Sequence, residues 1–312
     1  MAENLQRIAS RQAEIILALF GGIPLRVRRR LFLTLARLFY RLAPRHRLIA
    51  LHNLKTAFPE KDMEEIARIA RGVYRNMALV AAEFFDIPSL SPARIRETIE
   101  VEGMEHYREA LKRNRGILMF GAHFGNWELK AAAAALLLKP VMVIYRPLDS
   151  KLLDALANRV RSATGNMPLP KERAMRPMLR YLKDNGIIGL LIDQNVDWYE
   201  GVFVDFFGRP ACTTDGLALL ALHTEAPVMP AFLVRVGEGR FRLVIGEEVP
   251  IVKTGDRKAD VLENTQIFTS IIEEMVRRYP DQWLWVHQRW KTPPERSRLE
   301  KNPSSISLPT AS

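Results

Sequence analysis

The sequence contains one stretch whose residue types and spacing could perform catalysis, GAHFGNWE at residues 121–128. His123 is followed five positions later by Glu128, and an imidazole oriented by a carboxylate is a common general base. With 6 histidines and 35 acidic residues in the chain, chance alone gives about one match to this spacing. The elements on either side of the pair must therefore decide whether it is a site.

A strand and a helix are predicted on the two sides of this pair. GILMF (116–120) has the composition of a buried strand, and ELKAAAAALLL (128–138) is a strong helix former. His123 then lies in the turn after the carboxyl end of the strand, where open α/β sheets bind their ligands. Asn126 is the predicted N-cap, and amides near the helix start could donate to a developing oxyanion.

Two other interpretations of the pair remain open on these residues alone. His123 could be an ordinary turn residue, and Glu128 could simply favour the positive end of the helix dipole. A metal site is the third interpretation, but the spacing differs from HExxH, and no second histidine or cysteine is close in sequence. We therefore assign no metal ligand.

From residue 116 onward, short runs rich in β-branched residues alternate with helical stretches. This alternation predicts an α/β fold with a mostly parallel central sheet flanked by helices. Residues 1–115 read as helices broken by prolines, so an N-terminal helical region precedes the sheet. The predicted strands are GILMF, VMVIY, IIGLLI, PVMPAFLVRV and an antiparallel strand at 241–249; the predicted helices are 128–138, 150–164, 173–185 and about 260–278.

Basic residues are concentrated near the N-terminus. Residues 1–55 contain eleven Lys or Arg but only Glu3 and Glu14 as acids, in a chain whose net charge is +11. LFLTLARLFYRLA (31–43) has leucines at helical spacing, and a basic amphipathic helix of this kind suits an anionic bilayer surface. The alternative is a helix packed on the protein with a solvated basic face. The best apolar run, 15–25, is broken by Gly-Gly and Pro, so we expect a peripheral or monotopic protein.

Three regions follow from these patterns. Residues 1–45 are the basic, membrane-associating helical segment, residues 46–291 form the α/β domain, and residues 292–312 are a polar tail expected to be disordered. Cys212 is the only cysteine, which excludes an internal disulfide and fits a reducing compartment. The start of the chain lacks a signal-peptide pattern.

A series of short blocks lies along most of the chain: NLKTAFPE (53–60), GAHFGNWE (121–128), YRPL (145–148), RVRS (159–162), LIDQ (191–194), GVFVDFFGRPACTT (201–214), APVMPAFLVR (226–235) and QWLWVHQRWK (282–291). In the same order, these blocks resemble those of the glycerolipid-type acyltransferases, and in particular the bacterial lipid A secondary acyltransferases (lauroyl and myristoyl transferases). The resemblance extends over about residues 45–291 and favours the catalytic interpretation of the His-x4-acid block.

The resemblance implies that residues 46–291 transfer a fatty acyl group from a thioester to a hydroxyl of a lipid A precursor. His123 would take the proton of that hydroxyl and return it to the departing thiol, while Glu128 would hold the imidazole tautomer. No cofactor is implied, because the thioester would be carried as a co-substrate by the phosphopantetheine of acyl carrier protein. We expect no acyl-enzyme on Cys212, since a lone cysteine in a loop is usually inert. The implied location is the cytoplasmic face of the bacterial inner membrane.

Three arginines in these blocks are candidates for substrate binding. Arg146 follows the predicted strand VMVIY, and Arg159 and Arg161 lie on the next predicted helix. The planar guanidinium matches phosphate oxygens, so these residues could bind the phosphates of the acceptor or of phosphopantetheine. The alternative for each is an ordinary surface charge.

Four further candidates come from the later blocks. Asp193 and Gln194 end the predicted strand IIGLLI, and Asp193 could orient Arg161 or a sugar hydroxyl, or could simply cap a turn. In FFGRP, Gly208 would form a turn and Arg209 could contact a phosphate.

Two rival interpretations remain. Acyltransferases for phosphatidylinositol mannosides or for lysophospholipids resemble the same family; they would keep the chemistry but change the acceptor, and could use acyl-CoA. A non-catalytic protein that binds a membrane surface or nucleic acid through its basic N-terminus would not need His123, but we see no nucleic-acid-binding motif. The expected partners are therefore acyl carrier protein, a lipid A precursor or related glycolipid, and the membrane, with no nucleic acid.

Overall fold

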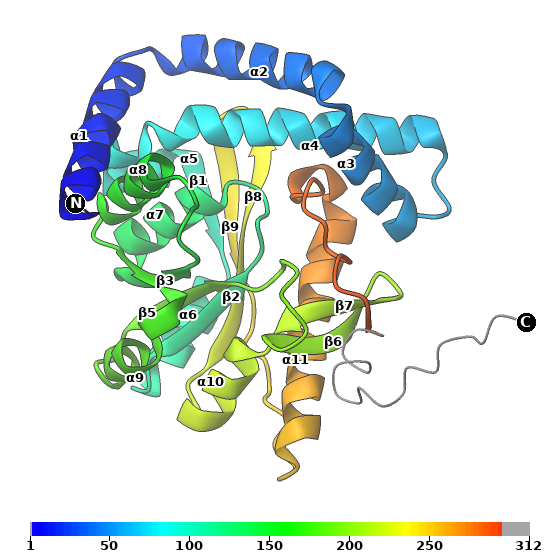
Figure 1. Ribbon diagram of the computed structural model, residues 1–312. Coiled ribbons are helices and arrows are strands. Elements are labelled where there is room, and N and C mark those ends of the chain that lie inside the picture. The colour runs from blue at the N-terminus through cyan, green and yellow to red at the C-terminus, as the bar shows by residue number, and fades with distance from the viewer. Residues whose placement is uncertain (1, 295–312) are drawn as a thin grey trace, which may run out of the picture.

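A seven-stranded sheet with helices on both faces forms the body of the protein (Figure 1). The computed structural model describes residues 2–294, so the predicted tail at 292–312 lies almost wholly outside the described residues. The helices are α1 Ala2–Gly21, α2 Leu25–Leu42, α3 Pro44–Ala57, α4 Met63–Phe84, α5 Pro92–Thr98, α6 Met104–Lys112, α7 Trp127–Leu137, α8 Lys151–Ser162, α9 Met175–Lys183, α10 Gly216–Thr224 and α11 Arg257–Arg278, with short 3₁₀ turns η1 Ile87–Ser89, η2 Lys171–Arg173 and η3 Pro280–Gln282. The strands are β1 Ile99–Glu102, β2 Ile117–Gly121, β3 Val141–Tyr145, β4 Met167–Pro170, β5 Ile187–Leu191, β6 Gly201–Phe206, β7 Arg209–Thr214, β8 Val228–Gly237 and β9 Arg240–Ile245.

The strand order of the large sheet is β1-β9-β8-β2-β5-β3-β4. Every neighbouring pair is parallel except β8 and β9, which form an antiparallel hairpin. This confirms the predicted α/β fold with a mostly parallel sheet. It also confirms the antiparallel strand predicted at 241–249, which is β9. Strands alternate with helices because parallel neighbours need a crossover connection.

The edge strands β1 and β4 and the separate hairpin of β6 and β7 were not predicted from the sequence. The FFGRP segment forms the tip of this hairpin, where Phe207 and Gly208 both have positive φ angles of 56° and 73°. Two consecutive positive φ angles are typical of a two-residue turn that matches the twist of its strands. Cys212 consequently lies within β7, and not in the loop where we expected it.

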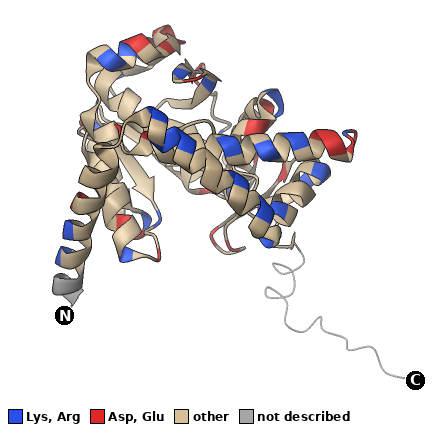
Figure 2. Cartoon of the chain, turned by 90° about the horizontal axis from the view of Figure 1, so that it is seen from above, with Lys and Arg blue, Asp and Glu red and all other residues tan. Residues whose placement is uncertain are grey.

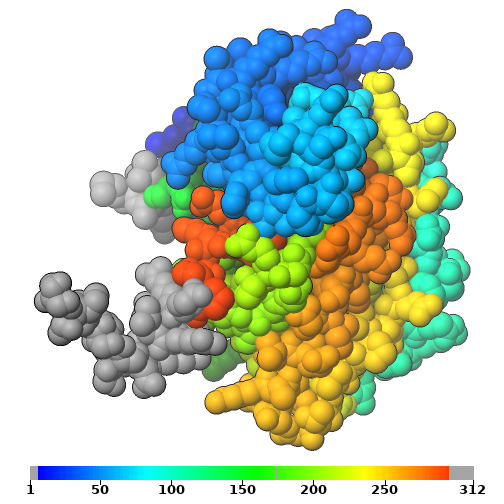
Figure 3. Space-filling view, turned by 90° about the vertical axis from the view of Figure 1, so that its right-hand side faces the viewer, coloured from blue at the N-terminus to red at the C-terminus, as the bar shows by residue number. Residues whose placement is uncertain are grey.

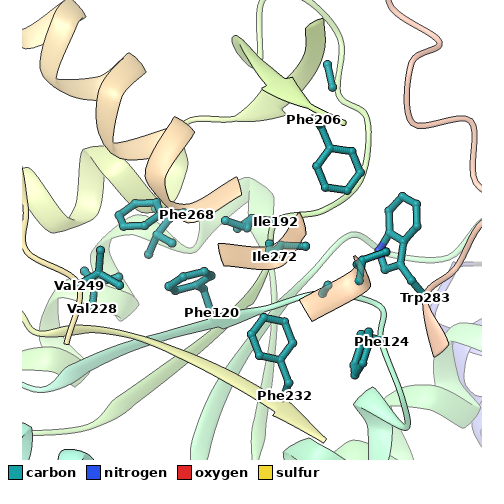
Figure 4. Close-up of a cluster of buried hydrophobic side chains, with 14 of the residues drawn as sticks. Phe120, Phe124, Ile192, Phe206, Val228, Phe232, Val249, Phe268, Ile272 and Trp283 are labelled. Carbon is teal, nitrogen blue, oxygen red and sulfur yellow. The ribbon is translucent and has the colours of Figure 1, made fainter. Parts of the chain in front are cut away.

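Both faces of β2 are buried, which explains its continuous apolar sequence. Ile117 and Met119 point into a cluster with residues of α6 and α7. Leu118 and Phe120 point the other way, into the larger cluster with α11. Figure 4 shows this larger cluster around Phe120. The alternation follows from the two-residue period of a strand.

The N-terminal helices lie against the sheet domain rather than apart from it. In Figure 1, α2 runs along α4, and α1 lies beside α8, in agreement with their contacts. The face in Figure 3 shows α4, the β6–β7 hairpin and α11 meeting in one continuous surface. Within residues 2–294 no single helix is long and apolar enough to cross a bilayer; only the pair 6–21 and 25–42, bent by 108°, meets the length and composition required.

The last described segment, after η3, is packed into the core. The indoles of Trp283 and Trp285 are almost fully buried and meet edge to face, with ring centroids 4.6 Å apart. His287 accepts the backbone N–H of Asn195 at Nε2, over 2.9 Å, and its carbonyl accepts the Asn53 amide at 2.8 Å. This segment therefore joins α3 to the loop that follows β5.

The half-buried His287 should make the stability of the protein depend on pH. Burial lowers the pKa of His287 to about 4 from its ordinary 6.5, against the opposing charge of Asp193. The unfolded chain therefore binds a proton below about pH 6.5 that the folded protein does not accept until near pH 4, so stability is full above pH 6.5 and falls towards pH 4. Between about pH 7.5 and about pH 5, this histidine should cost the wild-type protein on the order of 2 kcal/mol in free energy of unfolding. His287→Gln, whose amide oxygen can still accept the Asn195 N–H, should not show this part of the loss. Urea unfolding of both proteins at the two pH values measures this; the same loss in both would contradict it.

Candidate active site

Two neighbouring strands bring His123 and Asp193 to the same edge of the sheet. β2 and β5 are parallel, and their last paired residues are Gly121 and Leu191. His123 and Asp193 each lie two residues beyond this pair. The carboxyl ends of parallel strands form the edge at which α/β proteins bind ligands.

The carboxylate of Asp193 binds His123 twice. Its Oδ1 lies 2.9 Å from the His123 Nδ1, and its Oδ2 accepts the backbone N–H of His123 at 3.0 Å. The indole Nε1 of Trp283 also donates to Oδ2, at 2.8 Å. Because a carboxylate only accepts hydrogen bonds, this contact requires the proton on Nδ1 and leaves Nε2 as the basic nitrogen. The Asp193 side chain is 1% exposed, whereas that of His123 is 23% exposed and can be reached by a substrate.

The surroundings of Asp193 keep it ionised. Burial would raise its pKa, but the charge of His123 and the hydrogen bonds from His123 and Trp283 outweigh burial and lower the pKa to about 2. Lys130 adds a second cation nearby: its Nζ donates to the carbonyl of Ala231 at 3.1 Å. Burial lowers the pKa of Lys130 to about 8, and the charge of Asp193 partly opposes this change.

Glu128, which we expected to orient the imidazole, binds Arg161 instead. Its Oε2 accepts Nε of Arg161 at 2.9 Å and its Oε1 accepts Nη2 at 2.6 Å, a two-point ion pair whose side chains are 11% and 18% exposed. The guanidinium of Arg161 also lies 5.6 Å from the ring of Tyr145. The carboxylate hydrogen-bonded to Nδ1 of His123 is thus that of Asp193. Arg161, which we had considered as a partner of Asp193, binds Glu128 instead. The two carboxylates have separate partners.

The turn between His123 and α7 is tightly constrained. Gly125 has a φ angle of +58°, and a Cβ there would lie 1.8 Å from the carbonyl oxygen of Leu233, so only glycine fits. Asn126 caps α7 as predicted, accepting the N–H of Leu129 at 3.0 Å. The first amides of the helix have no intrahelical acceptor and point towards its N-terminal end. The turn therefore sets where His123 lies relative to these amides.

The other two arginines of the expected phosphate cluster lie apart from Arg161. Arg146 follows β3 and is 77% exposed, with Asp149 as an ion-pair partner at 4.0 Å. Arg159 is 63% exposed and pairs with Glu14 of α1 at 3.1 Å. Residues two apart on a helix face different directions, which explains why Arg159 and Arg161 do not converge.

The remaining candidates occupy two different places. Gln194 is half-buried directly after Asp193, at the active edge. Gly208 forms the hairpin turn as predicted, and Arg209 is exposed at the start of β7. α11 holds this hairpin tip, since Glu273 accepts the N–H of Phe207 at 2.6 Å. Within residues 2–294, no hydrogen bond connects Arg209 to His123 or Asp193.

The thiol of Cys212 is buried, and burial raises its pKa to about 11, although the charge of Arg289 opposes the increase. A thiol with this pKa is almost wholly protonated near neutral pH and is a poor nucleophile. No group of three His, Cys, Asp or Glu side chains among the described residues could hold a metal ion.

Three residues near the site were not predicted from the sequence: Trp283, Lys130 and His287. Trp283 and His287 belong to the QWLWVHQRWK block, to which we assigned no role. They reach the loop after β5 from 90 and 92 residues away in sequence. Their composition gives no indication of this contact, because it depends on the tertiary path of the chain. Lys130, two residues after Glu128, reads as a solvated helix residue in an alanine-rich stretch.

Comparison with known proteins gives a consistent result. A family model described as bacterial lipid A biosynthesis acyltransferase matches residues 10–292. The chain is 28% identical to the lipid A biosynthesis palmitoleoyltransferase of Escherichia coli K12 over 252 residues, or 80% of each chain. It is 28% identical over 285 residues, 90% of each chain, to the lipid A biosynthesis lauroyltransferase of the same organism.

A related protein with another acceptor in its name also matches. The phosphatidylinositol mannoside acyltransferase of Mycolicibacterium smegmatis is 26% identical over 212 residues, 67% of each chain. The family match covers the strands that carry His123 and Asp193, the α7 turn, and the buried segment that contains Trp283. The chain belongs to the bacterial lipid A biosynthesis acyltransferase family.

Proposed function

We propose that the protein transfers a fatty acyl group from acyl carrier protein to a hydroxyl of a lipid A precursor, with His123 as the general base. The observation that carries this proposal is the buried Asp193 carboxylate, which holds the Nδ1 of a substrate-accessible histidine at 2.9 Å. Family membership supports acyl transfer to lipid A. The donor and the proton path are the parts that we infer.

The proton path follows from the hydrogen bonds of the imidazole. Nε2 of His123 removes the proton of the acceptor hydroxyl as its oxygen attacks the thioester carbonyl. Asp193 stabilises the imidazolium that results, as the carboxylate of a catalytic triad does. When the tetrahedral intermediate collapses, the carbon–sulfur bond breaks and the imidazolium returns the proton to the pantetheine sulfur. The amides at the start of α7 would donate to the oxyanion.

A direct transfer without an acyl-enzyme fits the single cysteine, because Cys212 is buried and its pKa is raised to about 11. An acyl thioester on acyl carrier protein supplies the donor, so no resident cofactor is required. The net charge of +11 would attract an acidic carrier protein. The alternative acceptor, suggested by the name of the mycobacterial relative, is a phosphatidylinositol mannoside. A lysolipid acceptor and acyl-CoA as donor belong to the same alternative on the basis of the resemblance.

Replacing His123 should abolish transfer. Because the base contributes about 10²- to 10⁴-fold to acyl transfer, His123→Ala should lose at least about 100-fold in kcat while remaining folded. The assay measures transfer from labelled acyl carrier protein and from acyl-CoA to a tetra-acylated lipid A precursor, a phosphatidylinositol mannoside and a lysophospholipid. His106→Ala, on the exposed surface of α6, is the control and should keep full activity.

Each outcome has a definite meaning. Transfer to the lipid A precursor that depends on His123 and prefers acyl carrier protein supports the whole proposal. Transfer only to one of the other lipids would keep the mechanism but reject the acceptor. Equal activity of wild type and His123→Ala would reject the mechanism.

The arginines divide into two proposed roles. Glu128 holds Arg161 through two of its three guanidinium nitrogens, next to the start of α7, so we propose that this pair shapes the site beside His123. Arg146 is mostly exposed after the end of β3, and we propose that it binds a phosphate of the donor or acceptor. Arg159, Gln194, Gly208 and Arg209 stay candidates for substrate contacts on the basis of the resemblance.

The role of Arg146 predicts a specific kinetic change. Arg146→Ala should raise the KM of one substrate several-fold and leave kcat nearly unchanged, because it removes binding common to the ground state and the transition state. Arg257→Ala, at the exposed start of α11 at the bottom of Figure 1, is the matched control for loss of an exposed arginine. A collapse of kcat at constant KM would assign Arg146 to the chemical step instead.

We also propose that the protein lies on the cytoplasmic face of the inner membrane through α1 and α2. Lys and Arg recur along the N-terminal helices seen in Figure 2. Large apolar side chains on α1 and α2 are exposed by 42% to 70%. Four of them, all on α2, line an apolar groove of about 490 Å³ between α2 and α4. Such exposed apolar surface beside basic residues suits an anionic bilayer. These side chains are Ile8, Ile15, Leu19, Val27, Leu31, Leu35, Leu38, Phe39 and Leu42.

Vesicle binding tests this surface. The wild-type protein should sediment with vesicles that contain anionic phospholipid, and less so at high salt, because the Debye length shortens. The double variant Leu38→Glu and Leu42→Glu should lose this binding, because it places two charges in the apolar contact. Leu262→Glu, on α11 and 44% exposed, should bind like wild type. Equal binding of all three proteins would contradict the proposal.

A further inference from the structure

Glu83, near the end of α4, lies in a buried cluster that the proposed chemistry does not use. Its side chain is 7% exposed and accepts four hydrogen bonds from three other parts of the chain. Arg235 of β8 donates to both carboxylate oxygens, each at 2.9 Å. Arg29 of α2 donates to Oε1 at 2.9 Å, and the Asn126 amide donates to Oε2 at 2.8 Å.

The last of these contacts reaches the turn that carries His123. Asn126 is the N-cap of α7, so its side chain connects Glu83 on one side to the N–H of Leu129 on the other. Two helical turns earlier on α4, Asn76 donates to the carbonyl of Gly125 at 2.9 Å. Residues seven apart share a helix face, so a single face of α4 binds both ends of the Gly125–Asn126 peptide.

Arg235 joins these contacts into one network. Its Nε donates to Asn76 Oδ1 at 3.1 Å while its other nitrogens bind Glu83. Its backbone N–H and carbonyl both bind the side chain of Gln282, whose own carbonyl accepts the Gly125 N–H at 2.8 Å. The residue after Gln282 is Trp283, the donor to Asp193. The network therefore holds the turn of His123 and the segment that supports Asp193 in a fixed relation.

We propose that Glu83 is a positioning residue for catalysis: with Asn76 and Arg235 it fixes the Gly125–Asn126 turn, and through that turn the direction of His123 and of the first amides of α7. This inference rests on the proposed role of His123. Glu83 touches no reacting atom. Its effect comes from geometry, and a displacement of about 1 Å at the reacting groups can cost 100-fold in rate.

The carboxylate is suited to this role because it is surrounded only by donors. An amide in its place would turn an NH₂ group towards Arg235 or Asn126, where only an acceptor fits. Glu83→Gln keeps the size of the side chain and removes at least one of the four bonds. We expect kcat to fall about 10- to 100-fold with KM changed less than about 3-fold, because the turn shifts while the binding surface stays.

A second variant approaches the same turn without altering a charge. Asn76→Ala removes the bond to the Gly125 carbonyl and the bond from Arg235, and should also lower kcat. The double variant should lose little more than the worse single variant, since both changes release the same turn. This variant also keeps the test decisive if Glu83→Gln does not fold.

The matched control is Asp260→Asn. Asp260 of α11 is also a buried carboxylate, 2% exposed, and accepts the N–H and the hydroxyl of Thr254 and the N–H of Gly255. The Asp260→Asn variant should lose thermal stability, as Glu83→Gln should, but keep the wild-type kcat. The kcat is measured on the folded fraction with saturating substrate. The full-length proteins are assayed in the same acyl-transfer reaction, beside His123→Ala.

The outcomes separate this inference from the proposed function. A loss of kcat in Glu83→Gln and Asn76→Ala, but not in Asp260→Asn, supports the positioning role. Wild-type kcat in both α4 variants, or equal losses in the control, would overturn it while a dead His123→Ala still supports the base. Full activity of His123→Ala would instead reject the proposed function.

Discussion

The hydrogen bond between Asp193 and the Nδ1 of His123 is the interaction on which the active edge depends. It spans two neighbouring parallel strands, so its length is set by the register of β2 and β5 rather than by a flexible loop. Burial would favour a neutral Asp193, yet its donors, His123 and Trp283, lower the pKa to about 2. A permanently ionised partner fixes the tautomer that leaves Nε2 free to accept a proton.

The buried ion pair of Glu83 and Arg235 supports the same edge. Taking a charge out of water costs several kcal/mol unless it is paired and hydrogen-bonded. Glu83 and Arg235 meet this condition in full, and Arg289 donates to the backbone of Cys212 next to the loop after β5. The N-terminal helical region is thus part of the support of the site, since α4 supplies Glu83 and Asn76. The helices that we propose to contact the membrane pack directly on this support.

Much of the fold could be predicted from local patterns, because strands buried on both faces and strong helices leave clear signatures. The hairpin of β6 and β7 and the edge strands lack such a signature. The sequence correctly predicted His123 at a strand end and Asn126 as an N-cap, both of which depend on a few neighbouring residues. The partner of His123 depends instead on strand order: β5 lies beside β2, so Asp193 arrives next to His123. Glu128, although near His123 in sequence, forms its ion pair with Arg161 on α8.

We propose that Asp193, and not Glu128, orients the imidazole of His123. The kcat values of Asp193→Asn and Glu128→Gln in acyl transfer to the lipid A precursor test this, because each variant removes one charge without changing shape. We expect a loss of about 10³- to 10⁴-fold for Asp193→Asn, by analogy with triad enzymes, and a clearly smaller loss for Glu128→Gln. Near-wild-type kcat in Asp193→Asn, with a collapse in Glu128→Gln, would contradict it.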